Sequence, residues 1–428
     1  MASLSSEYSN TSNKMVEQLF RGVWNTEQEH KHIPYHLIEN MYHAESGLYS
    51  EGCWHNFVMG LNMFYLLKNA EFNEFCKENN VKEKLSKLSQ AVYKLNFDAS
   101  HGLFYQRQAS GIWQSSTESI MEERREFWKT NKEEKKLISN TMGLLFFATI
   151  GQEYKPEDLD LNKFCKKIID DFYDSEKQMW ATKSLPKGQQ VNLQHYRLVD
   201  HSLLYLALKK TLSNNSVDQA LTQRLEQVVE QVLEVILKKF KVETSERITY
   251  FDDKLTPHTK KFLWQDCWLV MALISSKKHN HLIPQLLIEM HHDYYDEESG
   301  FLFNESYGSI QDKSTIQIKM VENQKRKISP NSHQMYISFI NDNALFYFIL
   351  KNRHLYLNSD NTEISHKIEE LWTQTHASFS NYIEKSKVKH DPNTNEQRLL
   401  VSDYLKRQGL WANSEVIWTL LASFDELQ

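Results

Sequence analysis

The sequence is poor in the residues that make turns, with only 12 glycines and 7 prolines among 428 residues. A sheet-rich fold of this size needs more turn formers, so the scarcity favours helices joined by economical loops. Cysteine is also rare, at Cys53, Cys76, Cys165 and Cys267. None of the four forms a CxxC pair, which argues against a disulfide scaffold and predicts a reducing compartment.

Long apolar runs and blocks of basic residues are missing as well. No apolar run approaches the roughly 20 residues that a membrane span needs. The segment 1–14 is polar and lacks the apolar stretch of a secretory signal, so we expect a cytoplasmic protein with a flexible polar N-terminus. The formal net charge is -6, and without a basic block we expect neither nucleic acid nor membrane as a partner.

What the sequence does contain is a loose internal repeat. Six segments begin with a polar or aromatic cluster and continue as a helix that is apolar on nearly every side. A helix of that kind has to be buried on all sides. The six segments run from Cys53 to Leu67, Ser139 to Ile150, Val199 to Leu208, Trp264 to Ile274, Asn341 to Leu350 and Trp411 to Leu421.

Between these segments lie helices with one apolar stripe and one charged face. The clearest is Val217 to Lys239, where leucine, valine and isoleucine recur at helical spacing. Further examples are Lys82 to Leu95, Leu161 to Phe172 and Ile364 to Phe379. Amphipathic outer helices that alternate with apolar inner helices predict an all-α fold, an (α/α)6 barrel of six hairpins. No linker divides the chain, so we expect one domain over residues 1–428.

A second repeat follows several of the outer helices. It consists of an aromatic residue, an acidic turn, a glycine and an apolar-aromatic pair. The pattern predicts an Asx-type turn in which glycine supplies a positive φ, followed by a short β piece at each corner. Full copies are Tyr42–Tyr49, Phe97–Phe104 and Tyr295–Phe303, and degenerate copies are Tyr173-Asp174 with Met179-Trp180, and Phe251–Asp253.

These corners, together with inner helices such as Asp200–Leu208, resemble the six-hairpin (α/α)6 toroid superfamily. Within it, the resemblance is nearest to the N-acylglucosamine 2-epimerase and cellobiose 2-epimerase group, and it extends to six-hairpin glycosidases. It covers nearly the whole chain and implies a sugar substrate and histidines as acid and base.

The epimerase group typically carries a Pro-Gly-His-x-x-Glu-Trp run that opens an inner helix. The nearest match is Pro257-His258 followed by Trp264–Trp268; the glycine is missing, and Gln265 stands where the acid would fall. The group's histidine on the third inner helix corresponds to His201. The sixth inner helix has no counterpart histidine.

The six inner helices should begin at one end of the barrel, where their free N–H groups and side chains face a shared depression. A polyhydroxylated or anionic ligand would collect hydrogen bonds there. The catalytic candidates are Asp266, His201, His258, Asp200, Asp342 and Glu415. The substrate-binding candidates are Trp54, His55, Asn140, Trp264, Gln265, Asn343, Trp411 and Asn413. N-capping is the competing explanation for the acidic and amide residues.

The leading functional hypothesis is a sugar epimerase or isomerase in which His201, with a second base such as His258, moves a proton beside a carbonyl. The first alternative is an inverting-type glycoside hydrolase, with a pair of carboxylates flanking the scissile bond. Its candidate pairs are Asp266 with Glu415, and Asp200 with Asp342. The second alternative is a non-catalytic toroid that serves as a binding or interaction module.

We expect a small-molecule carbohydrate as the substrate, no cofactor and no metal, and a monomer or homodimer. Among the candidates, Asp266 is predicted to be the residue that matters most. It opens the most sharply defined inner helix, between Trp264 and Trp268.

Overall fold

The computed structural model describes most of the chain. The described residues are 13–21, 53–106, 134–184, 195–214, 217–243, 248–250, 261–297, 300–303, 305–306, 317–321, 324–328, 335–336, 340–357, 362–385, 388–390, 397–399, 410–422 and 424.

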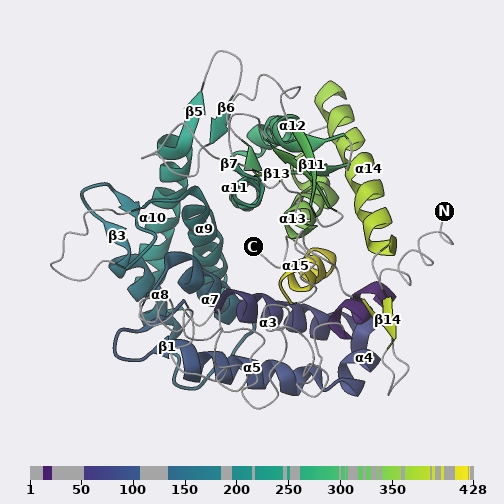
Figure 1. Cartoon of the computed structure of the whole chain (residues 1–428). Coiled ribbons are helices and arrows are strands. Elements are labelled where there is room, and N and C mark those ends of the chain that lie inside the picture. The colour runs from purple at the N-terminus through teal and green to yellow at the C-terminus, as the bar shows by residue number, and fades with distance from the viewer. Residues whose placement is uncertain are drawn as a thin grey trace.

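Six inner helices in the described ranges form a closed ring (Figure 1). Each packs against the next, and the last packs against the first. In α9, for example, every residue from Leu198 to Leu208 is buried, as the all-round apolar pattern predicts. The inner helices are α3 (Cys53–Lys68), α7 (Leu137–Thr149), α9 (Leu198–Leu212), α11 (Leu263–Ser276), α13 (Ile340–Lys351) and α15 (Leu410–Leu421).

Amphipathic helices surround this ring, each preceding an inner helix in the chain. In α8 the buried residues are Leu161, Phe164, Cys165, Ile168 and Ile169, which is one face of a helix. The outer helices are residues 13–21, α5 (Val81–Asn96), α8 (Leu161–Asp171), α10 (Gln219–Val235), α12 (Ile283–Tyr294) and α14 (Thr362–Lys385).

The described helices therefore make an (α/α)6 toroid, and the predicted fold class is confirmed. No described helix has both the length and the apolar character that crossing a bilayer requires. One domain over 1–428 stays a prediction.

Two-residue antiparallel hairpins form the corners between outer and inner helices. They are β1 (Phe97–Asp98) with β2 (Leu103–Phe104), β3 (Tyr173–Asp174) with β4 (Met179–Trp180), and β8 (Tyr295–Asp296) with β9 (Phe301–Leu302).

The turns of these hairpins have the predicted chemistry. Asp98 Oδ1 accepts the Ser100 N–H at 3.0 Å, which is an Asx turn. Gly102 and Gly300 take φ values of 70° and 72°, and Gln178 takes the equivalent left-handed conformation in the degenerate copy. The predicted corners at 42–49 and 251–253 lie outside the described residues.

Backbone hydrogen bonds join the segments that lead into neighbouring inner helices. The first N–H of α3, on Cys53, donates to Gln106 O, and the first N–H of α7, on Leu137, donates to Thr182 O at 2.9 Å. The strand β7 (Lys261–Phe262) before α11 pairs in the same way with β10 (Glu305–Ser306). These contacts supply carbonyl acceptors where an isolated helix would need an N-cap side chain.

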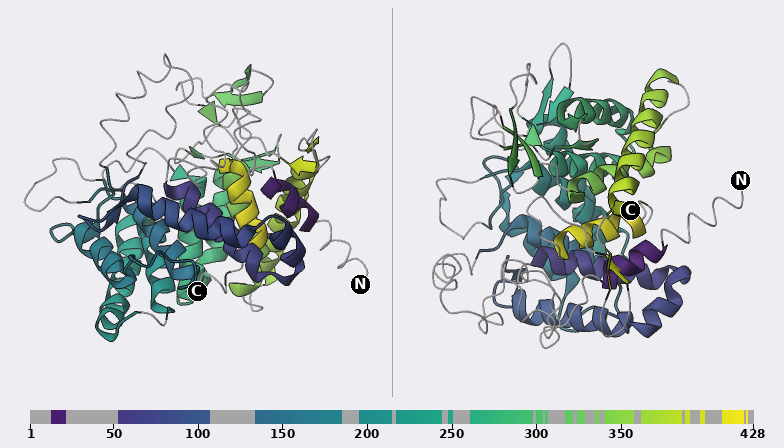
Figure 2. Two further views of the ribbon diagram at one scale, coloured as in Figure 1. Left: turned by 90° about the horizontal axis from the view of Figure 1, so that it is seen from below. Right: turned by 45° about the vertical axis from the view of Figure 1, so that its right-hand side comes forward.

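Further strands lie away from the glycine corners, where the sequence analysis placed none. The longest are β11 (Gln317–Val321) and β12 (Gln324–Ile328), which pair with β13 (Met335–Tyr336) and stand beyond one end of the ring (Figure 2). Shorter pairs are β5 (Lys241–Glu243) with β6 (Ile248–Tyr250), and β14 (Val388–His390) with β15 (Gln397–Leu399). The alternation of polar and apolar residues in Gln317–Val321 is the local signal for such a strand.

Candidate functional site

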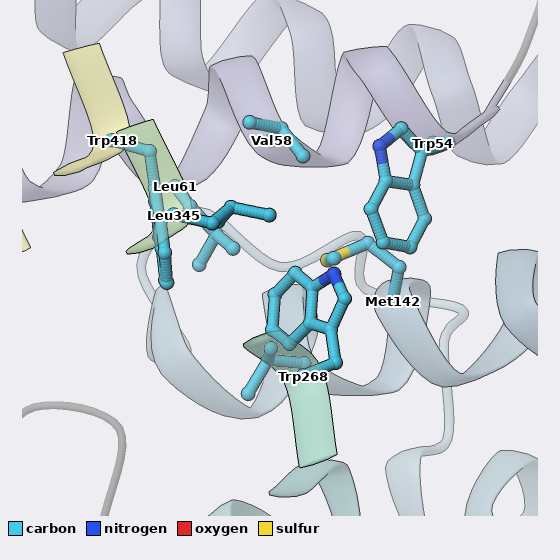
Figure 3. Close-up of a pocket in the computed structure, with 8 residues that line it drawn as sticks. Trp54, Val58, Leu61, Met142, Trp268, Leu345 and Trp418 are labelled. Atoms are coloured by element: carbon cyan, nitrogen blue, oxygen red, sulfur yellow. The ribbon is translucent and has the colours of Figure 1, made fainter. Parts of the chain in front are cut away.

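Apolar side chains of the described inner helices meet at the barrel axis. Eight residues from five inner helices line one small cavity on this axis (Figure 3). Its free volume of about 10 Å³ is room for about one water molecule. The lining residues are Trp54, Val58, Leu61, Met142, Leu145, Trp268, Leu345 and Trp418.

Three indole rings form part of the wall of this cavity. The ring of Trp268 meets Trp54 edge to face at 6.1 Å and lies 5.7 Å from Trp418. Trp54 is therefore on the wall of this cavity, where it packs against another tryptophan, and its predicted contact with a sugar stays a prediction. Among the described residues, this cavity is too small for a sugar ring.

The side chain of the fourth residue in several inner helices makes hydrogen bonds to a corner hairpin. Asn140 in α7 accepts the Phe104 N–H at 2.7 Å and donates to Phe104 O at 3.0 Å. Asn343 in α13 makes the same two bonds with Leu302, at 2.8 and 2.9 Å. In both cases the side-chain amide completes the hydrogen bonding of a corner strand.

His201 is the fourth residue of α9 and has the equivalent arrangement. Its Nε2 accepts the Trp180 N–H at 3.1 Å, and its Nδ1 lies 2.8 Å from Arg197 O, so Nδ1 carries the proton. The side chain is completely buried, and burial lowers the pKa of His201 to about 4. Both ring nitrogens are used by the backbone, so this geometry gives no support to the predicted acid–base role of His201.

Asp266 is the fourth residue of α11 and lies on a similar face. With about 100° of rotation per residue, it is about 200° around the helix from Trp268, which faces the axis. Its Oδ2 accepts the Tyr294 hydroxyl of outer helix α12 at 2.8 Å. This contact joins the carboxylate to the outer layer and gives no support to the predicted place of Asp266 in the shared depression, so its role stays a prediction.

The capping explanation for the acidic and amide residues is also wrong where it can be examined. The helices α7, α9 and α11 begin three residues before Asn140, His201 and Asp266. Their N-cap positions are Lys136, Arg197 and Phe262, and none makes a side-chain cap. By contrast, Asp160 and Asp218 do cap the outer helices α8 and α10.

Asp200, the third residue of α9, has an unusual environment. Its carboxyl is completely buried. Oδ2 accepts the Thr182 hydroxyl at 2.7 Å, whereas Oδ1 has no hydrogen-bond partner among the described residues. Burial raises the pKa of Asp200, against the opposing effects of Arg197, the Thr182 hydroxyl and Lys136. A buried carboxyl with one unused oxygen is typical of a functional position.

Aromatic and amide groups from α11 lie at the same level of the ring. The guanidinium of Arg197 lies over the ring of half-buried Trp264 at 5.7 Å, so a cation already covers one face of this indole. Gln265, the third residue of α11, is buried, and within the described ranges its Oε1 has no hydrogen-bond partner. The predicted ligand contacts of Trp264 and Gln265 stay predictions.

Asp342 and His55 are also third residues of their helices. Asp342 in α13 is buried, and its Oδ1 accepts the side-chain N–H of Asn341 at 3.0 Å. His55 in α3 is half-buried. His258 lies outside the described residues, as do the side chains of Trp411, Asn413 and Glu415 in α15.

The sequence analysis did not propose Thr182, Trp268 or Trp418. Trp418 follows Trp411 by seven residues, a two-turn spacing that places both on one helix face, so a signal was present. No sequence pattern pointed to Thr182, because its contact with Asp200 forms only when the corner before α9 is folded.

Comparisons with known proteins show the fold alone. No protein-family model matches the sequence, and no curated protein matches it. A D-mannose isomerase structure is similar at a TM-score of 0.55 and 8% identity, covering 88% of this chain and 86% of that chain. A sugar epimerase from a ruminal bacterium gives 0.52 and 10%, covering 86% and 87%.

A cellobiose 2-epimerase from Spirochaeta thermophila gives a TM-score of 0.50 at 11% identity, covering 87% of this chain and 86% of that chain. The resemblance to toroid enzymes is thus confirmed at the level of architecture.

Proposed function

We propose that this chain is a carbohydrate-active enzyme that transfers a proton on its sugar substrate, as an epimerase or isomerase does. The observation that carries the proposal is the Asp200 carboxyl, buried at the start of an inner helix with Oδ1 unpartnered. Support for the class of substrate comes from the toroid fold, which the chain shares with structures named as a sugar epimerase and a D-mannose isomerase.

Asp200 suits an acid–base role because its pKa is raised. A carboxyl that stays protonated closer to neutral pH can donate a proton to a sugar oxygen and take it back in a later step. The second proton-transfer group of this proposal is His258 or Glu415, both candidates from the sequence. His201 and Asp266 are not part of it, because their side chains are bonded to Trp180 and Tyr294.

One observation favours a glycoside hydrolase as the second candidate. Asp200 and Asp342 are both buried carboxylates at the third position of an inner helix, and a hydrolase needs two carboxyl groups around the scissile bond. The apolar axis and the fully bonded His201 favour the third candidate, a binding module without catalysis. A cytoplasmic location and a monomeric or homodimeric state are further expectations of the sequence.

The test is to incubate the protein with glucose, mannose, fructose and cellobiose in D2O. An epimerase or isomerase places deuterium from the solvent on the sugar next to the carbonyl, which NMR detects, whereas a hydrolase releases new reducing ends. We expect deuterium incorporation, and a loss of about 10²- to 10⁴-fold in rate for Asp200→Asn.

The matched control is Asp160→Asn, which changes the exposed N-cap of α8 and should leave the rate intact, because asparagine caps as well as aspartate. Full activity in a folded Asp200→Asn variant would exclude the role of Asp200. Hydrolysis without deuterium incorporation would replace the leading proposal with the second candidate.

A further inference from the structure

One extended segment crosses the first turn of α9 and is held there by two adjacent helix residues. Trp180 donates its backbone N–H to His201 Nε2 at 3.1 Å, and Thr182 donates its hydroxyl to Asp200 Oδ2 at 2.7 Å. The polar first turn of α9 thus fixes both the corner strand and the residue that contacts the candidate acid.

The position of Thr182 does not depend on its hydroxyl. Its N–H donates to His195 O at 2.8 Å, and its carbonyl accepts the first N–H of α7, from Leu137, at 2.9 Å. The side chain is buried. The hydroxyl is therefore carried on a backbone anchored from both sides, and its place relative to Asp200 is set before any ligand binds.

The two oxygens of Asp200 are consequently unequal, since Oδ2 receives a hydrogen bond and Oδ1 receives none from the part of the chain that the structure describes. We propose that Thr182 is a positioning residue that confines the exchangeable proton of Asp200 to Oδ1. This inference rests on the proposed acid–base role of Asp200 and adds the group that selects the reactive oxygen.

The proton transfer follows from this arrangement. In the protonated state the O–H bond is on Oδ1. When that bond breaks, the proton passes to a sugar oxygen, and its electron pair stays on the carboxylate. The Thr182 hydroxyl keeps its own proton and stabilises the charge from Oδ2. Return of the proton to Oδ1 restores the starting state.

Other charged groups around Asp200 are few. Arg197 approaches from the segment before α9, and Lys136 from the segment before α7. Lys136 is paired with Glu134 at 3.1 Å, and Glu134 also pairs with Lys183. On the side of α11, the third residue is the neutral Gln265. Both cations lower the pKa of Asp200, as does the Thr182 hydroxyl, so removal of the hydroxyl should raise it.

The experiment compares Thr182→Val with Thr182→Ser across a pH series of kcat and kcat/KM. Valine keeps the shape of threonine and removes the hydroxyl, and serine keeps the hydroxyl. We expect the limb of the pH profile that reports Asp200 to move by roughly one unit to higher pH in Thr182→Val and to return in Thr182→Ser.

An unchanged pH profile in a folded Thr182→Val variant would overturn the inference, even if its rate falls. That result differs from failure of the proposed function, which is full activity of Asp200→Asn. If Asp200→Asn is inactive and the Thr182→Val profile does not move, Asp200 remains the acid and Thr182 is only structural.

Discussion

At the scale of single residues, the polar side chains at the inner-helix starts divide by their position along the helix. The second residue of α3, Trp54, faces the axis. The fourth residues Asn140, His201 and Asn343 bond the corner strands. The third residue of α9, Asp200, bonds Thr182 beyond the corner strand through Oδ2, and no described residue bonds its Oδ1. Within the first turn of the inner helices, different positions therefore pack at the axis, bond the corner strands and carry the candidate acid.

The anchoring role of His201 predicts a specific dependence of stability on pH. The pKa of His201 is lowered to about 4 in the folded state, against about 6.5 in an unfolded chain. Its contribution is fully present above pH 6.5 and falls as the pH drops toward 4, because the unfolded chain binds a proton on this imidazole in that range while burial keeps it neutral in the folded state. The loss amounts to about 3 kcal/mol at most.

The variant His201→Asn should show a shallower fall of unfolding free energy between pH 6.5 and 4, since asparagine does not titrate. Urea unfolding at several pH values measures this difference. His366→Asn is the control, because His366 is exposed on α14. If the unfolding free energy of His201→Asn falls as steeply as that of the unchanged protein, His201 does not contribute to the pH dependence.

The sequence could identify which residues are polar at the helix starts, but not all of their directions. Asn140 and Asp266 were candidates for a cavity because the helix starts were not known exactly: the predicted segments begin at Ser139 and Trp264, whereas α7 begins two residues earlier and α11 one residue earlier. An error of two residues turns a side chain by about 200°. The Thr182–Asp200 contact joins residues 18 positions apart, and it exists only after the corner and the helix have packed together.

At the scale of elements, the helical pattern was well predicted because an apolar helix and an amphipathic helix differ in every turn. The predicted start of α3 at Cys53 and end of α15 at Leu421 agree with the structure. The corner hairpins followed from their Asp and Gly positions. The close approach of α3 and α7, however, depends on Gly60 and Gly143, whose role no local pattern reveals.

Gly60→Ala should destabilise the protein, although alanine is the better helix former by about 1 kcal/mol. An added Cβ would overlap Cε2 of Phe146 well inside van der Waals distance, and Phe146 is completely buried among Phe57 and Phe147. Overpacking of this kind costs about 1–3 kcal/mol. Guanidinium-induced unfolding of the variant measures this loss of unfolding free energy.

Gly143→Ala is the matched comparison on the facing helix. Its added Cβ would lie 3.0 Å from Cζ of Phe57, so a small shift of one ring relieves the contact. We expect a loss smaller than that of Gly60→Ala. If Gly60→Ala stabilises the protein, α3 and α7 are not packed as closely as the structure has them.

At the scale of the whole molecule, the ring depends on contacts between its first and last inner helices. The α15 helix packs on α3, and Trp268 of α11 reaches both across the axis through Trp418 and Trp54. A single indole thus connects helices that are not neighbours in the ring. This central contact joins three of the inner helices at the barrel axis.

Trp268→Ala should therefore cost about 3–5 kcal/mol, since it removes a large buried side chain and leaves a cavity. The cavity would have the shape of the lost side chain and apolar walls such as Leu345 and Met142. Free indole should bind there and restore stability by RT ln(1 + [L]/Kd). Thermal unfolding with and without indole measures this: the melting temperature of the variant should rise with indole concentration, and that of the unchanged protein should not.

If indole raises both melting temperatures equally, it binds elsewhere. If Trp268→Ala loses less than about 1 kcal/mol, the indole does not hold the ring together.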